Sequence, residues 1–126
     1  MSSFYITNPQ TGKVLDINGG LADNGSNIHL WEKNGCWSQK WFVFPDGTIT
    51  NLNTGKVLDI NDSLTTDGAN IHLWEKNGGW NQQWLFKEDG TIVNPHSGKC
   101  LDIAGGENTN GANIHLWTIH GGMNQR

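Results

Sequence analysis

The sequence has 126 residues and a formal net charge of −4, with 16% charged residues, 17 glycines and 7 tryptophans. This length suits one domain that can bury its own core. The acidic balance and the lack of a basic run argue against a nucleic-acid-binding or anionic-membrane-binding surface, and no apolar stretch is long enough to span a bilayer.

The chain repeats itself at a fixed interval. The segment NIHLWEKNG at residues 27–35 recurs unchanged at 70–78, and a third copy, NIHLW, spans 113–117. These copies are 43 residues apart, as are the LDI segments that precede them. A fixed internal period outranks local motifs when a fold is inferred. It predicts a single domain, 1–126, built without linkers from three repeats, at residues 1–43, 44–86 and 87–126.

Each repeat is predicted to be all-β, with four short strands. In the second repeat, runs rich in β-branched and aromatic residues at 47–51, 56–60, 71–74 and 82–86 are separated by glycine-containing turns and a polar loop. Three such repeats predict twelve strands, and no segment has the period and length of a helix.

The third repeat is shorter than the other two. It stops at Gln125-Arg126, before the tryptophan that opens the closing strand in the other repeats at Trp41 and Trp84. Its last strand is therefore absent from the chain. The sequence leaves open whether the chain is trimmed, whether this strand is supplied in another way, or whether the third repeat is loosened.

A four-stranded repeat cannot cover its own apolar face, so we expect the three to close around one core with pseudo-threefold symmetry. The core candidates are the recurring aliphatic residues and two closing tryptophans: Leu15, Ile17, Ile28, Leu30, Trp41, Leu58, Ile60, Ile71, Leu73, Trp84, Leu101, Ile103, Ile114 and Leu116. In IHLW, inward Ile and Leu predict that His and Trp point outward on the opposite face.

The recurring polar residues around each outward tryptophan have the chemistry of a sugar site. One carboxylate accepts hydroxyl hydrogens, amide and imidazole groups supply mixed donors and acceptors, and a flat indole can pack on the C–H face of a pyranose. The candidate carbohydrate-binding residues are Asp16, His29, Trp31, Asn34 and Gln39 in the first repeat, Asp59, His72, Trp74, Asn77, Asn81 and Gln82 in the second, and Asp102, His115, Trp117, His120, Asn124 and Gln125 in the third.

The pattern resembles a known family. Gln39-Lys40-Trp41 and Gln82-Gln83-Trp84 are two Q-x-W motifs at the 43-residue interval, with LDI and NIHLW in register before each. Over the whole chain this is similar to the ricin B-chain family of R-type lectins and carbohydrate-binding modules. The resemblance implies a β-trefoil fold and galactose-type ligands, with the LDI aspartates as acceptors, the tryptophans as stacking plates, Asn81 and Asn124 as sugar contacts, and a partly structural role for the Q-x-W glutamines.

The sequence departs from the family pattern in places. Ser38 replaces the asparagine in the first repeat, which puts the full affinity of that site in doubt. Histidine stands two residues before each tryptophan, where related sites often have glutamine, and the paired cysteines of secreted members are absent. We therefore expect Cys36 and Cys100, which occupy different repeat positions, to be free thiols.

The function expected is that of a multivalent lectin without catalysis, most simply an agglutinin with up to three equivalent shallow sites for galactose- or N-acetylgalactosamine-type glycans. One recurring Asp per site does not meet the two-carboxylate requirement of glycoside hydrolysis. Outward histidines related by threefold symmetry diverge, so no metal or cofactor is predicted. The alternatives are a protein-binding scaffold, or a module for xylan or another glycan attached to a larger enzyme or toxin.

Two further properties follow less directly. The N-terminal segment MSSFYITNPQ lacks a signal-peptide pattern, which predicts synthesis in the cytoplasm and release, if any, by lysis or a non-classical route. The oligomeric state, including a homo-oligomer, is left open.

Overall fold

The computed structural model describes residues 3–126 and contains ten short strands in that range. They are β1 (Val14–Ile17), β2 (Ile28–Trp31), β3 (Phe42–Val43), β4 (Ile49–Thr50), β5 (Val57–Ile60), β6 (Ile71–Trp74), β7 (Leu85–Phe86), β8 (Ile92–Asn94), β9 (Lys99–Ile103) and β10 (Ile114–Trp117). Three-residue 3₁₀ turns lie between them at Asn18–Gly20, Trp37–Gln39, Asn61–Ser63, Trp80–Gln82 and Ala104–Gly106, and another follows β10 at Met123–Gln125.

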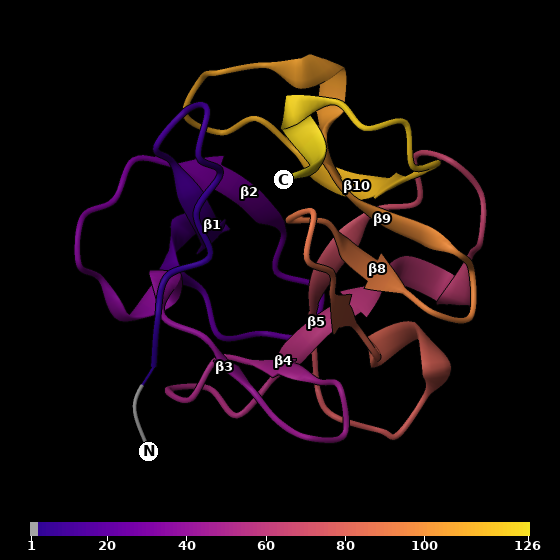
Figure 1. The fold of residues 1–126 in the computed structure, drawn as a ribbon. Coiled ribbons are helices and arrows are strands. Elements are labelled where there is room, and N and C mark those ends of the chain that lie inside the picture. The colour runs from indigo at the N-terminus through magenta and orange to yellow at the C-terminus, as the bar shows by residue number, and fades with distance from the viewer. Residues whose placement is uncertain (1–2) are drawn as a thin grey trace.

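The strands form three antiparallel sheets, with the orders β1-β2, β3-β4-β5-β6 and β10-β9-β8-β7. Figure 1 shows them surrounding a common centre. Each four-stranded sheet crosses a repeat boundary, because the closing strand of one repeat pairs with the first strand of the next, as β3 does with β4. The first sheet has only two strands, and the segment before it pairs through the isolated bridges of Phe4 with Trp41 and Thr7 with Val14.

The all-β prediction is confirmed, but the expected number of strands is too high. Ten strands form within residues 3–126, one fewer than the eleven that remain once the missing last strand of the third repeat is discounted, because the start of the first repeat makes only isolated bridges. The segment expected as a strand at 82–86 begins in a 3₁₀ turn, and only Leu85–Phe86 is extended and paired. No helix within residues 3–126 has the length and apolar character needed to cross a membrane.

The predicted core is confirmed in full. All fourteen candidate residues are buried, and together with Ile49, Ile92 and two alanines they form one apolar cluster. Both closing tryptophans also use their polar edge, because the indole Nε1 of Trp41 donates to the carbonyl of Leu15 and that of Trp84 to the carbonyl of Leu58, each at 3.2 Å. A buried indole thus satisfies its donor while filling the core.

The three repeats are joined in a closed ring of hydrogen bonds. The backbone N–H groups of Leu30, Leu73 and Leu116 donate to the carbonyls of Ala112, Ser26 and Ala69 respectively. The third predicted strand of every repeat, which is β2, β6 or β10, is thereby bound to a neighbouring repeat. Three asparagine side chains follow the same path. Asn27 donates to Asn113 at 2.9 Å, Asn113 to Asn70 at 2.9 Å and Asn70 to Asn27 at 2.8 Å. No repeat can leave this arrangement without breaking bonds on two sides.

A second set of asparagines attaches three of the 3₁₀ turns, Trp37–Gln39, Trp80–Gln82 and Met123–Gln125, to another repeat. Asn51 donates to the carbonyls of Trp37 and Lys40, and Asn94 to those of Trp80 and Gln83. Asn8 closes the ring by donating to Met123 and Arg126 at 2.8 and 2.9 Å. The C-terminal turn is thereby attached to the first repeat.

Replacing Asn70 with alanine removes two bonds of the asparagine ring and leaves the partner groups on Asn27 and Asn113 unpaired. We expect Asn70→Ala to lower the free energy of unfolding by about 1–3 kcal/mol. Urea unfolding followed by tryptophan fluorescence measures this change. The matched control is Asn53→Ala, because Asn53 is exposed, and its effect should stay within about 0.5 kcal/mol. Equal stabilities for the two variants would show that the ring contributes little.

The two cysteines are both unpaired, as expected, but differ in environment. Cys36 is exposed and Cys100 is buried. Burial, together with the charges of Asp102 and Asp89, raises the pKa of Cys100 to about 12. Since the thiolate is the reactive form, we expect one fast equivalent of thiol to react with a disulfide reagent at pH 8 in the folded protein and two after unfolding. Cys36→Ser should abolish the fast phase, and a fast phase that survives would contradict the assignment.

Candidate functional site

The same hairpin carries the candidate site in every repeat. Antiparallel pairing places Asp16 directly opposite His29, Asp59 opposite His72 and Asp102 opposite His115. The Leu and Ile pairs on either side face the core, so the Asp and His side chains share the other face of the hairpin. We call the group on this face a cradle. Cradle 1 comprises Asp16, His29, Trp31, Ser38 and Gln39; cradle 2 comprises Asp59, His72, Trp74, Asn81 and Gln82; cradle 3 comprises Asp102, His115, Trp117, Asn124 and Gln125.

Each aspartate forms a short hydrogen bond with its histidine. The His Nε2 atom lies 2.7 Å from the Asp16 carboxylate and 2.8 Å from those of Asp59 and Asp102. Because a carboxylate oxygen only accepts, we place the imidazole proton on Nε2. The histidine therefore fixes the orientation of the carboxylate.

The histidines lie on the same face as the tryptophans and away from the core, as predicted, but two of them are not open to solvent. His29 and His72 are buried, and His115 is half-buried. The reason is that the second face of the hairpin is also covered, by the segment that runs from the tryptophan to the 3₁₀ turn. One face meets the core and the other meets this segment, so simple alternation overestimates exposure.

A further donor reaches each carboxylate from the 3₁₀ turn. Asn81 Nδ2 donates to Asp59 and Asn124 Nδ2 donates to Asp102, both at 3.1 Å, and each also bonds the carbonyl of the following isoleucine. In cradle 1 the hydroxyl of Ser38 donates to Asp16 at 2.8 Å. The substitution thus keeps the bond to the aspartate but removes the amide group that the other two cradles present.

The three glutamines support the cradles from inside and do not form their surface. Gln39, Gln82 and Gln125 are 0, 0 and 3% exposed, so their prediction as sugar contacts must be corrected to a positioning role. Gln82 Nε2 donates to Asp59 and to the carbonyl of Glu75, both at 2.9 Å, and its Oε1 accepts from the Asn77 N–H. Gln125 makes the equivalent bonds in cradle 3, whereas Gln39 binds the loop backbone at Glu32 and Asn34.

Each tryptophan forms a plate over its histidine. The ring centroids of His29 and Trp31 are 5.1 Å apart with 23° between their planes, and the other two pairs are nearly the same. Trp31 and Trp74 are half-buried and Trp117 is 36% exposed. The outward orientation predicted for the tryptophans is therefore confirmed, and each keeps part of its ring open to solvent.

The far edge of each plate rests on a glycine of another repeat. A Cβ atom built on Gly25, Gly68 or Gly111 would lie 3.9 Å from the ring of Trp74, Trp117 or Trp31 respectively. All three glycines have φ near +90°, a conformation that other residues rarely adopt. Each cradle therefore takes its carboxylate from one repeat and the backing of its plate from a neighbour.

The residues predicted three positions after each tryptophan lie at the rim. Asn34 and Asn77 are exposed, and their side-chain oxygens accept from the N–H groups of Cys36 and Gly79. Their observed contacts stabilise the turn. His120 accepts a similar bond from Gly122 through Nδ1, while its Nε2 lies 3.5 Å from Asp102. Only in cradle 3 does this position approach the carboxylate.

Cradle 3 opens into a hollow of about 290 Å³ whose wall includes Gly105 and Gly106, two residues that were not predicted from the sequence. The equivalent residues of cradle 2 are Asp62 and Ser63, and both have positive φ values, 55° and 54°. Glycine occupies these positions in the other two repeats, so the recurring GG pair after LDI was the available signal. A left-handed backbone at two successive non-glycine residues is uncommon and distinguishes the rim of cradle 2.

The cradles share one chemistry. Each presents a nearly buried carboxylate, 4 to 7% exposed, whose position is set by neighbouring donors, and beside it a partly open indole. Within residues 3–126 no group of three or more His, Cys, Asp or Glu side chains is arranged to hold a metal ion. The combination of acceptors and an aromatic plate suits a ligand with hydroxyl groups and one apolar face.

The chain matches the model of a known protein family. The ricin-type beta-trefoil lectin domain matches residues 2–126. Among curated proteins, none matches the chain significantly.

Several solved structures share the fold. The designed threefold-symmetric protein ThreeFoil is 32% identical, with a TM-score of 0.87 over 94% of this chain and 91% of its own. An exo-beta-1,3-galactanase from Clostridium thermocellum is 33% identical, with a TM-score of 0.91 over 99% of this chain; the chain spans 29% of that enzyme. The C-half of an earthworm R-type lectin, solved in complex with GalNAc, is 29% identical, with a TM-score of 0.83 over 100% of this chain and 95% of its own. The predicted β-trefoil fold is confirmed.

The role of the buried glutamines can be measured through stability. Gln82→Leu keeps the side-chain size but leaves the Asn77 N–H and the Glu75 carbonyl unpaired and removes a donor to Asp59. We expect a loss of about 2–3 kcal/mol in the free energy of unfolding, measured with urea. The adjacent Gln83→Leu is the control because Gln83 is exposed, and it should change stability by less than about 0.5 kcal/mol. A similar loss in both variants would remove the case for a positioning role.

Proposed function

Because the chain belongs to the ricin-type beta-trefoil lectin family, we propose that it is a carbohydrate-binding domain with three shallow cradles, each taking one galactose- or N-acetylgalactosamine-type residue. The observation that carries this proposal is the threefold recurrence of a fixed carboxylate beside a partly open indole. A domain used only for protein contact would not need the same Asp, His and Trp geometry in all three repeats.

The proposed binding mode follows from the bonds that each carboxylate already makes. Asp59 accepts from His72, Asn81 and Gln82. A carboxylate has about four lone-pair directions, so one acceptor direction remains for a sugar hydroxyl. The amide of Asn81 lies beside it as a mixed donor and acceptor. The apolar face of the sugar then packs on the solvent-facing part of Trp74.

The sugar class is supported by resemblance. The earthworm R-type lectin was solved with GalNAc, and the galactanase by its name acts on a β-1,3-galactan. Both are near 30% identical to this chain over almost its whole length. Galactose-type ligands are therefore the first candidates for all three cradles.

We propose binding without turnover. Glycoside hydrolysis by the common mechanism needs two carboxyl groups flanking one bond. One aspartate recurs in the cradles, and the additional group near Asp102 in cradle 3 is the imidazole of His120. The carboxylate is held in place by donors, which suits recognition of hydroxyl groups.

The threefold arrangement supports multivalent binding. A single shallow site with one stacked ring and few hydrogen bonds binds weakly, but three sites on one rigid body can engage clustered glycans together. Such linkage raises avidity by about 10²–10⁴ over a single site. We therefore expect cell agglutination or binding to glycan-rich surfaces.

A second candidate is a targeting module for another glycan, such as xylan, within a larger enzyme. The galactanase favours it, because this chain matches 29% of that enzyme's length. Retention on insoluble xylan and on immobilised galactose distinguishes the two: stronger retention on xylan would favour the module, and stronger retention on galactose the lectin.

The proposal predicts that each LDI aspartate controls its own site. Asp59→Asn should weaken sugar binding at cradle 2 by about 10- to 100-fold, because a hydrogen bond to a charged acceptor contributes about 1.5–3 kcal/mol. Titration with galactose, lactose and N-acetylgalactosamine, followed by ¹H–¹⁵N NMR at the Trp31, Trp74 and Trp117 indole groups, measures the three sites separately.

The control is Asp89→Asn in the β7–β8 turn, where the carboxylate binds only Thr91. It should leave all three titrations unchanged. Asp16→Asn and Asp102→Asn should each affect the indole of their own cradle. If Asp59→Asn folded normally and bound sugar at Trp74 like the parent, the carboxylate would not be the principal acceptor.

A further inference from the structure

A two-residue segment from another repeat holds the tryptophan plate of every cradle. It consists of an asparagine or aspartate and the glycine that follows it, in the loop after the 3₁₀ turn at Asn18–Gly20 and in the equivalent loops. We call this pair a clasp. The first repeat contributes the clasp on Trp74, the second the clasp on Trp117 and the third the clasp on Trp31; they are Asn24-Gly25, Asp67-Gly68 and Asn110-Gly111.

The clasp binds both peptide groups that flank the plate. In the clasp on Trp74, the Gly25 N–H donates to the Leu73 carbonyl at 2.7 Å. The Oδ1 atom of Asn24 accepts from the Glu75 N–H at 2.8 Å. One bond lies just before Trp74 and the other just after it, so the first repeat restrains its backbone torsions. Because side-chain torsions depend on the backbone, the clasp also sets the direction of the ring.

The same two bonds recur in the other clasps. The backbone bonds run from Gly68 to Leu116 at 2.8 Å and from Gly111 to Leu30 at 2.7 Å, and the side-chain bonds from Thr118 to Asp67 and from Glu32 to Asn110, both at 2.8 Å. Asp67 is a carboxylate where the other clasps have an amide. It also accepts from the Thr118 hydroxyl, at 2.9 and 3.0 Å. The recurring feature is therefore the Oδ1 acceptor.

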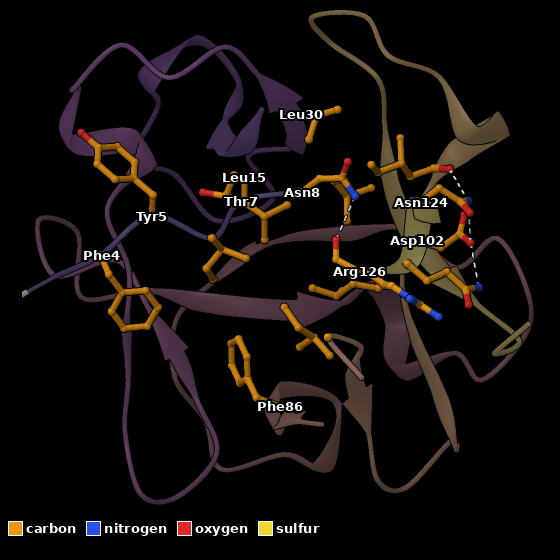
Figure 2. Close-up of a pocket in the computed structure, with 17 residues that line it drawn as sticks. Phe4, Tyr5, Thr7, Asn8, Leu15, Leu30, Phe86, Asp102, Asn124 and Arg126 are labelled. Carbon is orange, nitrogen blue, oxygen red and sulfur yellow. Dashed lines mark hydrogen bonds between the residues drawn. The ribbon is translucent and has the colours of Figure 1, made fainter. Parts of the chain in front are cut away.

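The two halves of a cradle are thus fixed by different repeats. In cradle 3 the carboxylate of Asp102 is held by Asn124 of its own repeat (Figure 2), whereas Trp117 is held by the second repeat. The clasp side chains are exposed, so their bonds contribute little to the stability of the whole fold. Their position indicates a local role, which is to set where the plate lies relative to the carboxylate.

We propose that Asn24, Asp67 and Asn110 are positioning residues for sugar binding, each acting on the cradle of another repeat. Asn24 acts on cradle 2, Asp67 on cradle 3 and Asn110 on cradle 1. They act through the plate, because a binding site keeps its affinity only when its groups are held within about 0.5 Å of the productive geometry. This inference rests on the proposed sugar-binding function.

The first test is Asn24→Ala, which removes the Oδ1 acceptor. We expect sugar binding at cradle 2 to weaken by about 3- to 10-fold, while cradle 1, in the repeat that carries the substitution, keeps the parent affinity. Titration with lactose and N-acetylgalactosamine, followed at the indole ¹H–¹⁵N signals of Trp31, Trp74 and Trp117, measures each cradle. The melting temperature should fall by less than about 3 °C.

The matched control is Asn108→Ala. Asn108 is also exposed and lies in the equivalent loop of the third repeat, where its Oδ1 accepts from Lys13 Nζ at 3.0 Å. The substitution removes one exposed hydrogen bond that is not part of a clasp. All three titrations should match those of the parent, and a loss as large as that of Asn24→Ala would overturn the proposal.

A second signal needs no sugar. The ring centroids of His72 and Trp74 are 5.2 Å apart with 20° between their planes, so the imidazole protons of His72 sense the ring current of the plate. Asn24→Ala should shift these protons and leave those of His29 and His115 in place. If the parent bound no sugar at all, the proposed function would fail, and this signal would decide by itself whether the clasp positions the plate.

Conservative replacement separates positioning from general damage. Asp67→Ala should weaken cradle 3 by about 3- to 10-fold, whereas Asp67→Asn keeps the Oδ1 acceptor and should stay within about twofold of the parent, because the exposed pair with Lys99 contributes little. The proposal is overturned if both Asp67 variants are equally impaired, if Asn24→Ala weakens cradle 1, or if it leaves cradle 2 and His72 unchanged.

Discussion

The structure depends on the closed ring of hydrogen bonds between repeats. None of the three sheets has a complete core of its own, and the first has only two strands. The ring of Asn27, Asn70 and Asn113, with the backbone bonds beside it, holds the three apolar faces against one another. Since short antiparallel sheets are marginally stable alone, this closure is the condition under which each hairpin exists, and hence under which each cradle exists.

The side chains of each cradle are held in place by contacts that depend on this closed ring. The carboxylate is fixed within its own repeat by histidine and by the 3₁₀ turn, while the plate beside it rests on a glycine of another repeat, as Trp31 does on Gly111. The position of the Trp31 ring beside Asp16 therefore depends on how the first and third repeats pack together. Such preorganisation lowers the entropic cost of binding, which matters for a shallow site with few contacts.

The threefold symmetry is broken at three functional positions. Cradle 1 has a hydroxyl at Ser38 where the others have an amide, the rim of cradle 2 carries Asp62 and Ser63 in a left-handed backbone, and cradle 3 has His120 near its carboxylate. The hollow lined by Phe4–Asn8 and by residues of the third repeat (Figure 2) shares Asp102 and Asn124 with the wall of cradle 3.

The features that the sequence alone determined are those that depend on the local order of residues along the chain. The 43-residue period gave the pseudo-threefold all-β architecture, and the alternation in LDI and IHLW gave the core residues, because the face that a strand buries follows from its apolar pattern. Only the tertiary structure decided that His29 and His72 are buried, that Gln82 supports Asp59 from inside, and that Gly111 backs Trp31. These features arise where segments far apart in the chain cover the second face of a hairpin, and a local pattern does not encode which distant segment will cover it.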